Sequence, residues 1–146
     1  MNICRNAIDL IGRIIIAAFF VPSGIAKISG YAGTAIAMEA KGIPGWLLPL
    51  VILTEIGCGL SVLLGWRTHI GAFLLGGYTF LAVLFFHFNA ASGLNQTTVF
   101  MAEAAVGAGL WILAAHGAGA WSLDALRRRR TGTPGPAPLQ PGAQPE

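Results

Sequence analysis

The sequence predicts an all-α membrane protein, a bundle of four transmembrane helices with both termini on the cytoplasmic side. Hydrophobic residues make up 55% of the 146 positions and charged residues only 10%, and the mean hydropathy is +0.69. These proportions leave too little polar side chain to cover a soluble globule. Four apolar stretches are each close to the roughly 20 residues that cross the roughly 30 Å hydrocarbon core of a bilayer. We therefore expect one transmembrane domain over residues 1–126, with spans at about 8–28, 46–66, 70–88 and 97–115.

The first span, about 8–28, carries one cation near each end, Arg13 and Lys27. At about 100° per residue, both cations fall on the same helical stripe as Gly24. Two cations on one stripe are expected to face the bundle interior, because lipid cannot solvate them. The alternative interpretation is a cleaved signal peptide with Arg5 and Arg13 as its basic region. The further spans favour an uncleaved first helix.

The second span, about 46–66, begins and ends with a tryptophan and has one ionisable residue near its centre. Trp46 and Trp66 fall where membrane proteins place an aromatic belt. Glu55 therefore lies near the middle of the bilayer, where a carboxyl group needs a partner, a proton or a function. In the loop before this span, the sequence predicts a short interfacial helix over 34–41 that stops at Gly42.

The third and fourth spans, about 70–88 and 97–115, differ in charge. The third has no charged residue and ends near His87, whereas the fourth contains Glu103. Glycines recur in the spans and allow neighbouring helices to approach closely. The predicted helix-packing positions are Gly24, Gly59, Gly76, Gly77 and Gly107.

Basic residues set the predicted orientation. Lysines and arginines collect in the cytoplasmic segments of membrane proteins. The side that carries the termini has seven such residues and the opposite side has two, Lys27 and Lys41. Residues 127–146 begin with an arginine run, then become rich in proline and glycine, and are expected to form a disordered cytoplasmic tail. The seven residues are Arg5, Arg13, Arg67, Arg127, Arg128, Arg129 and Arg130.

The membrane-embedded charges form the candidate functional network. Two cations, Arg13 and Lys27, balance two carboxylates, Glu55 and Glu103. Their depths along the spans predict that Arg13 pairs with Glu55 and that Glu103 lies nearer Lys27 and His87. Such pairs can fasten a bundle, or they can bind a headgroup or carry protons. The sequence leaves both interpretations open and identifies no catalytic residue.

Several other kinds of site are not predicted. No HExxH, Walker, GxGxxG, GxSxG or EF-hand pattern occurs. His69 and His116 end two spans at similar depth and could ligate a metal or haem, but interfacial histidines are more often solvated, so we predict no metal site. Cys4 and Cys58 lie at different depths along the predicted bundle, so we predict no disulfide between them. The basic residues form no broad face for nucleic acid.

Three motifs follow one another along the first two spans. They are an arginine in the first span (Arg13), a Gly-x-x-Lys-x-x-Gly at its end (Gly24, Lys27, Gly30), and a glutamate followed by glycines, a Leu-Leu-Gly and a basic turn (Glu55, Gly57, Gly59, Leu63, Leu64, Gly65, Arg67). With these motifs the chain resembles DoxX-like integral membrane proteins over about residues 8–115. The resemblance implies a multi-pass four-helix bundle in a bacterial inner membrane. The family takes its name from a subunit associated with thiosulfate:quinone oxidoreductase, and some relatives are linked to complexes that handle oxidative and thiol stress.

These observations together predict an accessory protein or subunit of a quinone- or thiol-linked redox system. Arg13, Lys27, Glu55 and Glu103 would line a polar pocket inside the membrane. The sequence identifies no cofactor of its own, and a quinone is the candidate ligand. Expected partners are the lipid bilayer, a redox protein and a second copy of the chain. A small transporter or channel and a structural or assembly factor remain the alternative functions.

Overall fold

A computed structural model describes residues 3–88 and 94–131, and every element in these ranges is a helix. Four helices are long and apolar enough to cross a membrane. The predicted all-α, four-span membrane fold is therefore confirmed, whereas the cytoplasmic location of the termini stays a prediction. The helices are α1 (Ile3–Ser29), α2 (Tyr31–Glu39), α3 (Leu48–Leu53), α4 (Gly59–Leu64), α5 (Thr68–Phe88), α6 (Leu94–His116) and α7 (Leu123–Thr131).

The second span is a composite helix, Gly45–Leu64. It begins with a 3-10 turn (Gly45–Leu47), continues through α3, widens into a π-helical turn (Thr54–Cys58) and ends with α4. A π-helical turn is rare and occurs often at functional sites. This one contains Glu55, the buried carboxyl group of the span.

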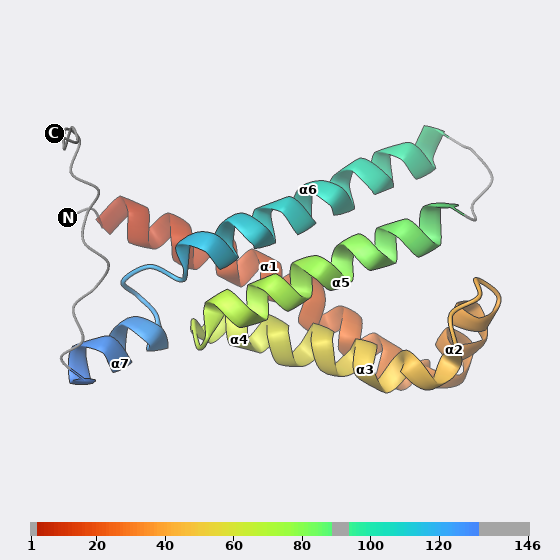
Figure 1. The fold of residues 1–146 in the computed structure, drawn as a ribbon, viewed down its shortest axis with the longest axis horizontal. Coiled ribbons are helices and arrows are strands. Elements are labelled where there is room, and N and C mark those ends of the chain that lie inside the picture. Colours follow the sequence, from red (N-terminus) through yellow and green to blue (C-terminus); the bar gives the residue numbers. More distant parts are fainter. Residues whose placement is uncertain (1–2, 89–93, 132–146) are drawn as a thin grey trace, which may run out of the picture.

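The spans do not pack equally on one another. Helix α1 packs along the second span, and α5 packs against both the second span and α6. Figure 1 shows α5 and α6 running side by side, with α2 at one end of the bundle and α7 at the other. We call these the α2 end and the α7 end. Helix α6 packs chiefly on α5, so α1 and α6 leave room between them.

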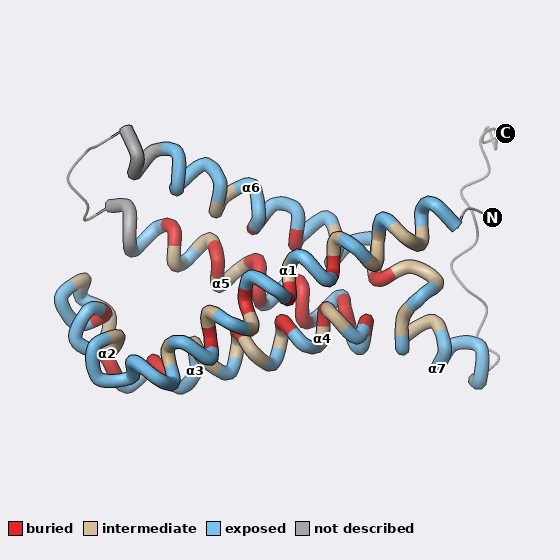
Figure 2. Tube along the Cα trace, turned by 180° about the vertical axis from the view of Figure 1, so that it is seen from behind, coloured by how far each residue is buried: buried red, intermediate tan, exposed pale blue. Residues whose placement is uncertain are grey.

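The burial pattern is that of a protein surrounded by lipid. Large apolar side chains such as Leu53 and Phe73 are exposed on the outside of the bundle, at 68% and 60%. Figure 2 shows buried positions where the helices meet and exposed positions along their outer faces. A bilayer would cover these apolar surfaces. The small buried core consists of Phe20, Val62, Ala72, Leu75 and Leu110.

Glycines allow close approach on both sides of the bundle. A Cβ atom at Gly59 would lie 3.1 Å from Val21 Cγ2 on α1. A Cβ atom at Gly76 would lie 2.7 Å from Trp111 Cδ1 on α6. Gly107 faces the Phe80 ring in the same way, at 2.9 Å, whereas no atom lies within 4 Å of a Cβ at Gly77. Of the five predicted packing glycines, Gly24, Gly59, Gly76 and Gly107 therefore lie against a neighbouring helix.

We expect Gly24→Ala to destabilise the bundle by about 1 to 3 kcal/mol, the usual cost of overpacking. The new Cβ would lie 2.6 Å from Ile56 Cγ1 and 3.3 Å from Glu55 Cβ, so the two spans would have to separate. Gly12→Ala is the matched control on the same helix, because nothing lies within 4 Å of that position. The control should be neutral or slightly stabilising, since alanine favours helix. SDS-induced unfolding in mixed micelles measures both variants, and equal effects would contradict the packing role of Gly24.

The loop before the second span contains the predicted short helix. Helix α2 begins at Tyr31 and ends at Glu39, so it starts earlier than expected. Gly42 has a φ of 78°, and its N–H donates to the Glu39 carbonyl while the N–H of Ile43 donates to that of Met38. This is the glycine stop that the sequence predicts, because a left-handed residue ends a helix.

At the α7 end, Asp124 ties α7 to the start of α5. Its carboxylate accepts hydrogen bonds from the backbone N–H groups of Arg67 and Thr68, at 2.9 and 3.0 Å, and from the Thr68 hydroxyl at 3.2 Å. Burial raises the pKa of Asp124, but these hydrogen bonds and the nearby Arg128 charge outweigh it and lower the pKa. The carboxylate is thus an ionised cap at the N-terminus of α5. The arginine run, for which no helix was predicted, lies in α7. The rest of the predicted tail, residues 132–146, falls outside the described residues.

Candidate functional site

The candidate site is a polar cluster around Glu55, a side chain in the interior of the bundle that is only 4% exposed. The Lys27 ammonium lies 2.9 Å from Glu55 Oε1 and 2.8 Å from Oε2. The Tyr78 hydroxyl donates a hydrogen bond to Oε1 at 2.7 Å, and the Ser23 hydroxyl lies 3.5 Å from the same oxygen. Lys27 also donates to Ser23 Oγ at 2.7 Å. Four side chains thus share one connected hydrogen-bond network.

Three spans bring this cluster together. Ser23 and Lys27 are four residues apart on α1, so they lie on one face, the face that packs on the second span. Glu55 comes from the π-helical turn, where the Cβ of Glu55 lies opposite Gly24 of α1. Tyr78 comes from α5. Removing any one span would break the network.

The ion pair explains how the membrane tolerates Glu55. An unpaired charge at the centre of a bilayer costs at least about 2.5 to 3.5 kcal/mol. Lys27 neutralises the carboxylate, and the Tyr78 and Ser23 hydroxyls satisfy further lone pairs. Charge-assisted hydrogen bonds of this kind are the stronger ones.

The predicted pair between Arg13 and Glu55 is wrong, because Lys27 takes the place of Arg13. Arg13 is buried at the α7 end, where its guanidinium donates to the Leu63 carbonyl at 3.1 Å and to the Trp121 carbonyl. Leu63 lies in the last turn of α4, whose carbonyls have no partner within the helix. A planar guanidinium with several donors suits such carbonyls well. The predicted depths of the residues along their spans therefore gave the wrong partner for Glu55.

The Glu55 cluster opens into a cavity of about 610 Å³ that we call the polar cavity. Helices α1, α2, α5 and α6 all contribute to its lining, α2 through residues that include Thr34 and Met38. Its lining includes three of the four predicted charged residues, Lys27, Glu55 and Glu103, but not Arg13. The full lining is Phe19, Phe20, Ser23, Lys27, Gly33, Thr34, Ala37, Met38, Lys41, Glu55, Tyr78, Ala82, Val99 and Glu103.

A second cavity, the apolar groove, adjoins the polar cavity. It has a volume of about 510 Å³ and runs between the second span and α5. Met38, Tyr78 and Ala82 line both spaces, so the polar cavity and the apolar groove meet at the Tyr78 ring. The remaining lining of the groove is apolar apart from Thr54, and consists of Ile43, Leu47, Leu50, Val51, Thr54, Phe73, Leu74, Gly77, Leu81 and Phe85.

Sequence reasoning missed two members of the cluster, Ser23 and Tyr78. Ser23 precedes Lys27 by one helical turn, and a tyrosine within an apolar span usually needs a partner for its hydroxyl. The sequence therefore indicates that both hydroxyls need hydrogen-bond partners, but it does not identify Glu55 as that partner. The predicted neighbour His87 lies in the last turn of α5, and its side chain is outside the described part of the structure.

The two histidines considered as metal ligands lie near the α7 end and contact backbone carbonyls. His69 Nδ1 hydrogen-bonds the Ala114 carbonyl, and His116 Nδ1 hydrogen-bonds the Ile112 carbonyl at 2.9 Å. Each imidazole therefore donates its Nδ1–H to a backbone carbonyl. His69 thus joins the start of α5 to the end of α6.

Comparison with known proteins identifies the family. The sequence profile of the DoxX family matches residues 8–88, which include Ser23, Lys27, Glu55 and Tyr78 but not Glu103. The chain is also 43% identical over 121 residues to the inner membrane protein YqjF of Escherichia coli (strain K12), a match that covers 83% of this chain and 92% of that protein. No solved structure gives a significant match. The chain is therefore a multi-pass inner-membrane protein that belongs to the DoxX family.

Proposed function

We propose that this protein binds a small amphipathic molecule with a quinone-like headgroup in the polar cavity and serves a redox partner as an accessory or subunit. One observation carries the proposal: an ion pair with a tyrosine hydroxyl attached lines an open cavity inside the membrane span. A pair that only fastened the bundle would have no need of a cavity beside it. Intramembrane ionisable groups are functional candidates by default.

Exposure assigns different tasks to the two charged residues. The Lys27 side chain is 24% exposed and the Glu55 side chain 4%. Lys27 is therefore the residue that donates to a ligand oxygen, and Glu55 positions the ammonium.

The available groups match the two redox forms of a quinone. A quinone carbonyl accepts hydrogen bonds, which the Lys27 ammonium supplies. A quinol hydroxyl donates, and Glu103, which lines the same cavity from α6, accepts. A site with both a donor and an acceptor in its lining accommodates both forms of the ligand. In this proposal, the redox partner protein exchanges the electrons that interconvert the quinone and the quinol.

The apolar groove accounts for the tail of such a molecule. The polar cavity and the apolar groove meet at Tyr78 and Met38, so a headgroup at Lys27 can continue into a chain in the groove. Ligand sites combine apolar walls with a few placed polar groups. A water-soluble substrate would leave the apolar groove unexplained.

Binding of decylubiquinone to the protein in nanodiscs tests the proposal, with quenching of tryptophan fluorescence as the readout. Tyr78→Phe is expected to weaken binding about 3- to 10-fold, because it removes one hydrogen bond from the network that holds Lys27 and Glu55. Tyr31→Phe is the matched control, since Tyr31 is an exposed residue of α2 outside the cavity lining. Circular dichroism confirms that both variants are folded. Absence of saturable binding to the unmodified protein, or equal weakening in both variants, would overturn the proposal.

A further inference from the structure

A third cavity, of about 450 Å³, lies at the α7 end between the start of α5 and α7. We call it the basic cavity, because its lining contains three arginines and a histidine. Arg67 immediately precedes α5, His69 lies in the first turn of α5, and Arg127 and Arg128 come from α7. It shares no lining residue with the polar cavity or the apolar groove.

The charge of the basic cavity is positive despite one carboxylate in its lining. Asp124 is the acidic residue among the lining residues, which include three arginines, and Arg128 is the cation close enough to lower its pKa. Both of its oxygens already accept hydrogen bonds from the backbone at the start of α5. Its task is to hold α7 against α5, which fixes the two arginine-bearing walls relative to each other.

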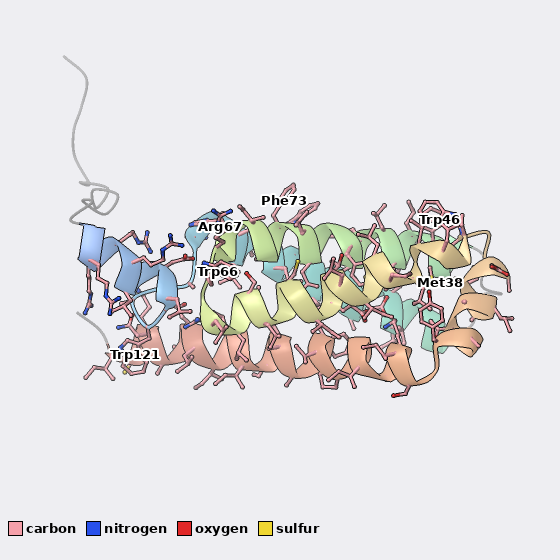
Figure 3. The ribbon with its side chains drawn as sticks, turned by 90° about the horizontal axis from the view of Figure 1, so that it is seen from below. Met38, Trp46, Trp66, Arg67, Phe73 and Trp121 are labelled. Carbon is pink, nitrogen blue, oxygen red and sulfur yellow. The ribbon has the colours of Figure 1, made fainter. Side chains whose placement is uncertain are left out.

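The basic cavity lies at the level of a membrane surface. Trp66 and Trp121 are 49% and 48% exposed near the ends of the adjoining spans, as in Figure 3, where both lie near the α7 end. Half-exposed tryptophans mark the headgroup level of a bilayer. A ligand in the basic cavity is therefore placed at the depth of lipid phosphates.

Apolar side chains continue from the basic cavity along α5 toward the centre of the membrane. Ile70 lines the cavity and is 54% exposed, and Phe73 and Leu74 follow at 60% and 50%. Figure 3 shows Arg67 and Phe73 along the same edge of the bundle. A phosphate at the arginines would thus have a surface for an attached acyl chain directly beside it, which free phosphate would not use.

We propose that the basic cavity binds the phosphate of an anionic phospholipid, with one acyl chain along Ile70, Phe73 and Leu74. Guanidinium groups bind phosphate through paired, charge-assisted hydrogen bonds. Basic pockets between membrane helices are suited to anionic headgroups. The lipid would join α7 to α5 from the membrane side, as Asp124 joins them from within. The phosphate-binding part of this site shares no residue with the polar cavity, whereas Phe73 and Leu74, along the acyl chain, also line the apolar groove.

The test compares two double variants of α7 with the same change in net charge. Arg127→Gln/Arg128→Gln removes two lining residues, whereas Arg129→Gln/Arg130→Gln removes two exposed arginines that do not line the cavity. The full chain is titrated in mild detergent with phosphatidylglycerol, and native mass spectrometry counts the bound lipid. We expect the first variant to bind about 30-fold more weakly, at roughly a factor of five per lost charge, and the second to bind within about threefold of the unmodified protein.

One further variant and two ligand controls complete the test. Arg67→Gln changes the opposite wall and should weaken binding by about fivefold, so it replaces the α7 variant if that variant does not fold. Phosphatidylcholine should bind far more weakly than phosphatidylglycerol, and millimolar inorganic phosphate should not displace the lipid. Three results would each overturn the proposal: an equal loss of phosphatidylglycerol binding in the two α7 variants, equal binding of phosphatidylglycerol and phosphatidylcholine, or displacement of the lipid by inorganic phosphate.

Discussion

Lys27→Met is expected to destabilise the folded protein by about 3 to 5 kcal/mol, the usual cost of removing one partner from a buried ion pair. Lys27 is the cation that contacts Glu55, at 2.8 and 2.9 Å, and Glu55 is 3% exposed. Without the ammonium, the carboxylate would have to remain charged in a low-dielectric interior or take up a proton. SDS-induced unfolding in mixed micelles measures the loss.

Lys41→Met is the matched control for this substitution. Lys41 lines the same cavity, but it is not a hydrogen-bond partner of Glu55 in the network that surrounds that carboxylate. Its replacement should change the free energy of unfolding by less than about 1 kcal/mol. If the two lysine variants were equally stable, the central role of the Lys27–Glu55 pair in the fold would be refuted.

The double variant Lys27→Met/Glu55→Gln separates stability from binding. It removes both charges of the pair, so position 55 no longer carries a carboxylate without its counter-charge, and much of the lost stability should return. It also removes the ammonium that the proposed ligand contacts. We therefore expect a folded protein that no longer binds decylubiquinone, which a purely structural ion pair would not predict.

The fold was predictable because it depends on hydropathy along the chain. Lipid selects apolar stretches of a set length, and that requirement is visible in the sequence without knowledge of how helices rotate. The stop at Gly42 was predictable for a similar reason, since a left-handed glycine ends a helix locally. Helix α7 was not predicted, because its position depends on a long-range contact between Asp124 and the start of α5.

The candidate site was predictable only in part, because partners depend on how the helices rotate and cross. The sequence identifies Glu55 as a buried carboxyl group, and the shared stripe on the first span predicts that Lys27 faces inward. Depth alone then favoured Arg13 as the partner. The choice between the two cations is made by the π-helical turn and by the carbonyls at the end of α4, and neither feature has a sequence signature of its own.

Arg13→Met is expected to cost about 2 to 6 kcal/mol and to act at the opposite end of the bundle from the Lys27 variant. Arg13 is 1% exposed, and its guanidinium donates to the carbonyls of Leu63 and Trp121. Removing it leaves two acceptors without that donor in a buried region, each costing about 1 to 3 kcal/mol. Arg5→Met on the same helix is the control, because Arg5 is exposed and its loss should be nearly neutral.

The effect of Arg13→Met should also be local. Trp121 begins the segment that leads into α7, so loss of its anchor should release α7 and speed cleavage by trypsin at the arginine run. Arg13 does not line the polar cavity, so the folded protein should still bind decylubiquinone with unchanged affinity. Faster proteolysis with intact binding would place Arg13 in the architecture of the α7 end. Lost binding with unchanged proteolysis would instead return Arg13 to the charge network that the sequence predicted.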